Sequence, residues 1–100
     1  MSPQPAEHRP DRIEVLLLSQ ASCSFCDQAK AILDRLGGEY PLSVTTLELA
    51  SSDGRAVAER GGIVFPPGIF LDGEPFSYGR LSERKLRREL QRRLGARRHP

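Results

Sequence analysis

Residues 13–38 read IEVLLLSQASCSFCDQAKAILDRLGG and carry the clearest structural signals of the chain. The apolar run over residues 13–19 has the length and the aliphatic content of a buried β-strand. A small polar loop follows it. Residues 23–36 then repeat apolar side chains at helical spacing until a Gly-Gly pair ends the helix. Cys23 and Cys26, which form a C-x-x-C motif, therefore stand at a strand-to-helix junction.

The rest of the chain continues this alternation of strands and helices. The apolar periodicity and the turn residues predict strands at 42–49, 69–71 and 75–78, a short helix at 54–60, and a last helix from a Ser82 cap to Gly95. Asp72-Gly73 is a strong hairpin signal between the last two strands. The order β-α-β-α-β-β-α predicts an α/β fold with a four-stranded mixed sheet flanked by helices. Its first two strands must be parallel, because a helix crosses between them.

Length and composition fit one modest globular domain. The chain has 100 residues, of which 38% are hydrophobic and 28% are charged. We expect a disordered, proline-rich lead over residues 1–11, a folded domain over residues 12–95 and a basic tail over residues 96–100. No apolar run is long enough to span a bilayer, and the first residues lack the apolar core of a signal peptide. These features predict a cytoplasmic protein, in which paired cysteines seldom form permanent disulfides.

The positive charge gathers at one end of the chain. Residues 80–100 hold nine Arg or Lys residues against two Glu residues, a difference of +7, so the overall charge of +2 leaves −5 for the rest. Such an end can attract an acidic partner, although a solvated helix face is its ordinary explanation. We do not expect nucleic-acid binding, because few aromatic residues are interleaved with the basic ones.

The spacing of the two cysteines suits thiol–disulfide chemistry. Two intervening residues at the start of a helix can bring the sulfurs within bonding distance. The free N–H groups and the positive dipole at a helix N-terminus stabilise a thiolate. Cys23 is therefore the expected nucleophile, and the more buried Cys26 is the expected resolving thiol. Asp27 would oppose the thiolate if it faced the sulfur and would favour the helix N-terminus if it faced solvent.

Other interpretations of the cysteine pair stay open. A C-x-x-C motif can be half of a zinc site, but no second pair of ligands with the usual spacing follows it. A zinc ion shared by two chains, or a pair of merely buried cysteines, would also fit the motif. The strand-helix-strand context is what favours redox chemistry.

Two motifs resemble a known family. The run Cys23-Ser24-Phe25-Cys26-Asp27-Gln28-Ala29-Lys30 resembles the C-P-Y-C-x-x-A-K pattern of glutaredoxins, and more closely that of a bacterial subgroup of glutaredoxin-like proteins with C-x-[LF]-C-D-x-A. The run Pro67-Gly68-Ile69-Phe70-Leu71-Asp72-Gly73 resembles the family stretch P-x-I-F-I-x-G. The resemblance spans residues 13–94. It implies a thioredoxin/glutaredoxin-like fold in which Pro67 follows a cis peptide bond beside the cysteines.

The resemblance also implies a set of site residues. Cys23 and Cys26 would be catalytic, and the residues that shape the site or bind substrate would be Pro67, Pro66, Phe25, Ser24 and Gln20. Three of these depart from the family pattern. Pro66 has no N–H to offer a bound peptide or glutathione, Gln20 replaces a lysine, and Phe25 replaces a tyrosine. Three other aromatic side chains, Phe65, Phe70 and Phe76, are predicted to lie in the core.

Together the residues and the resemblance predict a glutaredoxin-like dithiol oxidoreductase. Its partners would be a protein or low-molecular-weight disulfide and an upstream reductant, either glutathione or a flavin-dependent reductase. We expect a monomer with no metal, no resident cofactor and no membrane contact. The alternative is a non-catalytic binding or redox-switch module that uses its cysteine face and its basic last helix.

Overall fold

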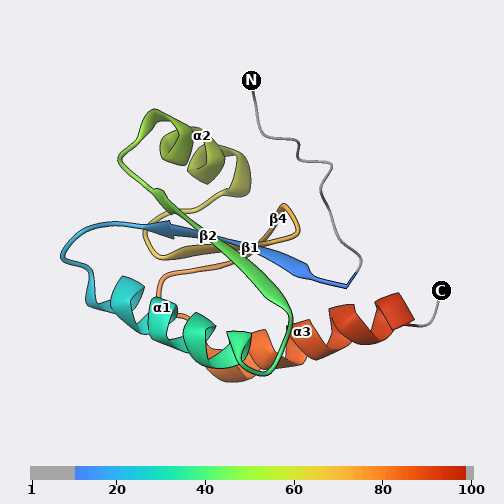
Figure 1. Ribbon diagram of the computed structural model, residues 1–100. Helices are drawn as coiled ribbons and strands as arrows, with labels where there is room; N and C mark the ends of the chain where they lie inside the picture. The colour runs from blue at the N-terminus through green and yellow to red at the C-terminus, as the bar shows by residue number, and fades with distance from the viewer. Residues whose placement is uncertain (1–10, 99–100) are drawn as a thin grey trace.

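The computed structural model describes residues 11–98, and Figure 1 shows their arrangement. The elements in chain order are β1 (Ile13–Ser19), α1 (Ser24–Gly37), β2 (Leu42–Glu48), α2 (Ser52–Gly61), β3 (Gly68–Leu71), β4 (Glu74–Tyr78) and α3 (Glu83–Arg98). This order is the predicted β-α-β-α-β-β-α. The predicted N-terminal lead lies outside the described residues except for its last residue.

The four strands form one mixed sheet in the order β2-β1-β3-β4. β1 pairs with β2 in parallel, while β3 is antiparallel to both β1 and β4. The predicted mixed sheet, with its parallel first pair, is confirmed. β1 is an interior strand with apolar side chains packed on both faces of the sheet, which explains its nearly continuous apolar sequence.

Helices cover both faces of the sheet. α1 and α3 lie together on one face and α2 lies on the other (Figure 1). Under α1 and α3 the larger core cluster joins side chains of both helices to β1 and β3: Ile13, Val15, Leu17, Ala29, Leu33, Leu36, Ile69, Leu71, Leu81, Leu86 and Leu90. A smaller cluster around Leu18, Ala58 and Phe70 lies beneath α2. Leu86 and Leu90 therefore mark the buried face of α3, and Leu94 packs partly buried against the same cluster.

The β3–β4 hairpin turns on Asp72 and Gly73, as the sequence predicted. Both residues have positive φ angles, 49° and 83°, which is the conformation of a two-residue type I′ turn. Asp72 also accepts a hydrogen bond from the Glu14 backbone N–H at 2.9 Å, which fastens the turn to β1. The hairpin is thus held at the end of the sheet opposite the cysteines.

Strand register brings distant segments together at the cysteine end of the sheet. Gly68 pairs with Leu18 on one side and with Tyr78 on the other. Pro67 therefore lies beside the end of β1, from which the chain continues into the cysteine loop. The peptide bond between Pro66 and Pro67 is cis. The Pro67 carbonyl accepts a hydrogen bond from the Gly79 N–H at 2.8 Å, which ties this segment to the end of β4.

Two expectations are wrong. α3 does not end at Gly95 but continues to Arg98, so residues 96–98 are helical rather than part of a tail. Gly95 does not adopt the positive φ of a C-terminal cap, and alanine and arginine after it are good helix formers. Phe65 is 50% exposed rather than buried, because it lies in the loop before the two prolines and packs beside Tyr78. No described helix is long and apolar enough to cross a bilayer.

Candidate functional site

The site begins with Cys23, which is the N-cap residue of α1. Its backbone is extended, with φ −122° and ψ 105°, and its Sγ accepts a hydrogen bond from the Cys26 N–H at 3.1 Å. The Cys23 carbonyl accepts from the Asp27 N–H at 3.1 Å, which closes the first helical turn. The sulfur thus occupies the position that a serine or aspartate oxygen takes in an ordinary cap.

The two cysteines are joined by a disulfide. Their Cα atoms lie 5.2 Å apart, inside the usual range for such a bond. Cys23 is half-buried, whereas Cys26 is completely buried on the inner face of α1. An incoming thiol or disulfide therefore meets the Cys23 sulfur first. Asp27 is exposed, so its charge lies in solvent at the helix N-terminus, where it is favourable.

The other predicted site residues surround this disulfide in different ways. Gln20, Ser24 and Phe25 are exposed on the loop and on the first turn of α1. Pro66 is half-buried and Pro67 is buried. Strand register brings Pro67 to the same sheet end as the cysteine loop. The structure therefore gathers the predicted residues at one end of the molecule.

An apolar surface lies at this end, and the part that Val64 and Phe65 contribute to it was not foreseen. Phe25 is 42% exposed, Tyr78 is 44% exposed and Val64 is 71% exposed. The rings of Phe65 and Tyr78 meet edge to face with centroids 5.2 Å apart. Phe65 also covers Gly79, where an added Cβ would lie 2.7 Å from its ring. An apolar run in a loop, directly before two prolines, was the signal that could have indicated this surface.

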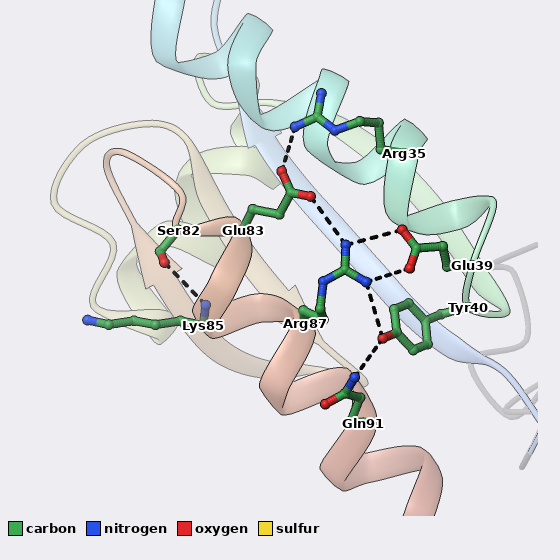
Figure 2. A network of polar contacts seen from close by, with 8 residues as sticks. All are labelled: Arg35, Glu39, Tyr40, Ser82, Glu83, Lys85, Arg87 and Gln91. Carbon is green, nitrogen blue, oxygen red and sulfur yellow. Dashed lines mark hydrogen bonds and ion pairs between the residues drawn. The ribbon is translucent and has the colours of Figure 1, made fainter.

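An ion-pair network ties α3 to the C-terminal end of α1 (Figure 2). Glu83 accepts from Arg35 at 2.5 Å and from Arg87 at 3.4 Å, and Arg87 also pairs with Glu39. The hydrogen bond from Arg35 lowers the pKa of Glu83, and the hydrogen bond from Arg87 lowers the pKa of Glu39. Both acids therefore keep their negative charge to a lower pH than a free glutamate does.

A second group of ion pairs lies farther along α3. Glu89 accepts from Arg92 at 2.6 Å and from Arg93 at 2.7 Å. The hydrogen bond from Arg92 is the main reason that the pKa of Glu89 falls from 4.5 to about 2. Arg93 reaches on to Glu74 in β4 at 2.6 Å. These contacts fix the helix to the β3–β4 hairpin.

A cavity of about 590 Å³ opens between α1 and the start of α3. Its α1 wall is formed by Gln28 and Ile32, and its other wall by Arg80, Leu81, Ser82, Glu83, Arg84 and Lys85. We call this the α1–α3 groove. A smaller cavity of about 200 Å³ lies on the α2 face, around Leu16, Val57 and Phe70. Among residues 11–98, no three or more His, Cys, Asp or Glu side chains gather where they could hold a metal ion.

Comparison with known proteins identifies the family. The glutaredoxin family model matches residues 15–76, which is more than half of the chain. The chain is similar in structure to a mutant thioredoxin of Halobacterium salinarum NRC-1, with a TM-score of 0.65 and 17% identity over 82% of this chain and 74% of that one. It also matches glutaredoxin 1 of Francisella tularensis, solved with cacodylate, with a TM-score of 0.48 and 18% identity over 83% and 98% of the two chains. Comparison with curated proteins gave no match. This chain, with its cysteine pair at the start of α1, belongs to the glutaredoxin family.

Proposed function

We propose that this protein is a dithiol thiol–disulfide oxidoreductase of the cytoplasm, with Cys23 as nucleophile and Cys26 as resolving thiol. The observation that carries the proposal is the unequal placement of the two sulfurs. Cys23 is reachable and accepts an N–H bond at the helix N-terminus, whereas Cys26 is buried one turn further on. This N–H and the helix dipole favour a thiolate on Cys23 in the reduced protein.

The reaction transfers two electrons from the dithiol to the substrate. The Cys23 thiolate attacks one sulfur of a substrate disulfide, which forms a mixed disulfide and releases the other substrate sulfur as a thiolate. The Cys26 thiolate then attacks the Cys23 sulfur and releases the second substrate thiolate. The product is the Cys23–Cys26 disulfide seen in the structure. An external thiol, such as two glutathione molecules, or a flavin-dependent reductase must return two electrons for the next cycle.

The residues around the disulfide favour a broad contact surface over a tight glutathione site. Pro66 cannot donate a backbone hydrogen bond to substrate, and Gln20 carries no charge to attract a carboxylate. Phe25, Phe65 and Tyr78 instead present exposed rings at this end of the sheet. We therefore propose a protein disulfide as substrate, bound in part through apolar contact, with Pro67 shaping the site beneath it.

A redox titration of the purified protein tests the proposal. The protein is equilibrated in glutathione buffers, its free thiols are alkylated, and its intact mass is measured. We expect one dithiol-to-disulfide transition with a midpoint between roughly −300 and −120 mV, the span of known oxidoreductases. Absence of any intramolecular disulfide over this span would show that the proposal is wrong and would favour a binding module or a metal site.

Single-cysteine variants then separate the two thiols. The Cys26→Ser variant should accumulate a mixed disulfide with substrate, because the resolving attack is lost. The Cys23→Ser variant should neither turn over nor trap substrate efficiently, because the remaining thiol is buried. If Cys23→Ser retained turnover, the assignment of the nucleophile would be wrong. If it lost turnover but kept a bound partner, recognition would be independent of the redox step.

A further inference from the structure

Three acidic residues on or beside α3 are engaged in ion pairs. Glu39, Glu83 and Glu89 each bind one or two arginines that link α3 to α1 or lie along α3 itself. In Figure 2 the carboxylates of Glu39 and Glu83 converge on Arg87, between the two helices. These pairs neutralise much of the positive charge that the sequence places on this helix.

Four cations remain outside this network. Arg80, Arg84, Lys85 and Arg88 are exposed, and among residues 11–96 no carboxylate forms an ion pair with any of them. Figure 2 shows the Lys85 side chain extended away from the network. Opposite charges have thus been paired between the helices, while an uncompensated positive surface has been left on the outside.

Three of these cations, Arg80, Arg84 and Lys85, line the α1–α3 groove. Two of them stand where their charge opposes the helix dipole. Arg84 and Lys85 stand in the first turn of α3, at the end where the helix dipole disfavours positive charge. Glu83, the only acid among the described residues that line the groove, is already bound to Arg35 and Arg87. The groove therefore combines an open volume of about 590 Å³ with cations that an anionic occupant would stabilise.

The groove lies within reach of a substrate held at Cys23. Gln28 on its wall is five residues along α1 from Cys23, which is about 8 Å of helix rise, and Ile32 is about 14 Å along. At the other wall, Arg80 follows Tyr78 and Gly79 at the cysteine end of the sheet. An extended peptide covers about 3.3 Å per residue, so roughly two to five residues would connect a cysteine at Cys23 to the groove.

We propose that the α1–α3 groove selects protein disulfides that carry acidic side chains within about five residues of the reacting cysteine, through Arg80, Arg84 and Lys85. This inference rests on the proposed oxidoreductase function. A carboxylate-bearing peptide fits better than a nucleic acid, because none of the groove residues in the described part of the chain is an aromatic on which a base could stack.

The test compares two disulfide-bonded peptides that differ only in charge. One carries Glu and Asp after its cysteine, and the other carries Gln and Asn. The reduced protein is mixed with each peptide, the reaction is quenched by alkylation, and the second-order rate constant is read by mass. We expect the acidic peptide to react about tenfold faster at roughly 0.01 M salt, and the ratio to fall toward one near 1 M salt, where charges are screened.

Matched triple variants locate the effect. The variant Arg80→Gln, Arg84→Gln, Lys85→Gln should lose the preference for the acidic peptide while it keeps its rate with the amide peptide and its redox midpoint. The control variant Lys30→Gln, Arg55→Gln, Arg60→Gln removes the same charge from exposed positions outside the groove and should keep the preference. Equal loss of the preference in both triple variants would overturn the proposal, since net charge alone would then explain it. Retention of the preference in both would overturn it too, since the groove cations would then not be its source.

Two further measurements distinguish other ligands and the underlying function. If the groove variant slowed reaction with a glutathionylated neutral peptide as much as with the acidic peptide, the groove would bind glutathione, and the proposal would be wrong.

If the wild type reacted with no disulfide, the proposed oxidoreductase function would be wrong, but the groove could still be tested by binding. Fluorescence anisotropy with the acidic peptide, its cysteines replaced by serine, would still show whether the groove variant alone loses binding. Displacement of that peptide by a single-stranded oligonucleotide at lower concentration than by an acidic competitor peptide would also contradict the proposal.

Discussion

At the scale of single residues, the site lacks two polar groups: a backbone N–H at Pro66 and a side-chain hydroxyl at Phe25. Pro66 supplies no N–H next to Pro67, and a hydrogen bond to substrate that is absent for this reason costs on the order of 1 kcal/mol. Phe25 presents an exposed ring without a hydroxyl group. The disulfide is therefore surrounded more by apolar surface than by hydrogen-bond donors.

Replacing Pro66 tests this view. The Pro66→Val variant gains a backbone N–H, so we expect kcat/KM with a glutathionylated peptide to rise about fivefold, the equivalent of one net hydrogen bond. Steady-state kinetics with glutathione and a coupled reductase would measure the change. Pro75→Val is the control, since Pro75 is an exposed residue near the hairpin turn. An unchanged rate for Pro66→Val would mean that substrate does not use this backbone position.

Two glycines show how far the effect of one added methyl group depends on its surroundings. A Cβ on Gly54 would lie 2.0 Å from the Glu48 carbonyl oxygen, whereas a Cβ on Gly95 would meet nothing within 4 Å. We expect Gly54→Ala to lower the free energy of unfolding by about 1–3 kcal/mol through forced displacement of α2. Gly95→Ala should raise it by about 0.5–1 kcal/mol through helix propensity. Urea unfolding measures both, and changes of the same sign would contradict the packing described around Gly54.

At the scale of elements, α3 is held by charge as well as by its leucines. Glu83 and Glu39 connect it to α1 and to the turn that follows α1, while Arg93 connects it to the hairpin. Each pair is solvent-accessible and contributes little stability by itself. Together the pairs fix the position of α3 relative to α1 and the hairpin. The network holds the α3 wall of the groove in place against α1.

The stability that these pairs contribute should depend on pH. The folded-state pKa of Glu89 is about 2 against 4.5 for the free side chain, so its contribution is complete above pH 4.5 and is lost as the pH falls toward 2. Glu39 and Glu83 shift in the same direction. Urea unfolding between pH 2 and pH 6 should therefore show Glu89→Gln losing less stability on acidification than the wild type. Glu59→Gln, an exposed change in α2, should follow the wild type, and identical curves for all three proteins would refute the assignment.

The elements themselves could be predicted because their signals are local. Asp72-Gly73 specifies its turn without help, and the apolar run of β1 indicates an interior strand by itself. The pairs Arg35–Glu83 and Arg87–Glu39 could not be predicted, since each joins residues 48 positions apart through the packing of two helices. The same holds for the α1–α3 groove and for Phe65, whose exposure depends on where the chain turns before the prolines.

At the scale of the whole molecule, the larger core cluster joins α1 and α3 to the sheet. Leu86 is fully buried and packs in the cluster that also contains side chains of α1 and of both central strands. Truncation of the Leu86 side chain would leave a cavity, because the surrounding side chains are close-packed and can relax only in part. The cysteine end of the sheet depends on this cluster for its shape, because α1 rests on it.

Truncation of Leu86 tests this dependence. We expect Leu86→Ala to lower the free energy of unfolding by about 2–5 kcal/mol, as for other fully buried leucines. Leu94→Ala, at the partly buried end of the same helix, should cost clearly less. Urea unfolding of the two variants gives the comparison. Equal losses would show that the two ends of α3 are equally buried in solution.

The sheet order has a consequence for how the molecule assembles as it is made. β1 precedes both of its neighbours along the chain, and the register that joins Val15 to Leu71 spans more than half of the sequence. A ribosome exposes β1 long before β3, and the leucines of α3 that close the core emerge later still. Contacts between such distant segments form slowly. The nascent chain must therefore carry the β1 edge that faces β3 unpaired until late in its synthesis, which makes β1 the segment that a chaperone would protect.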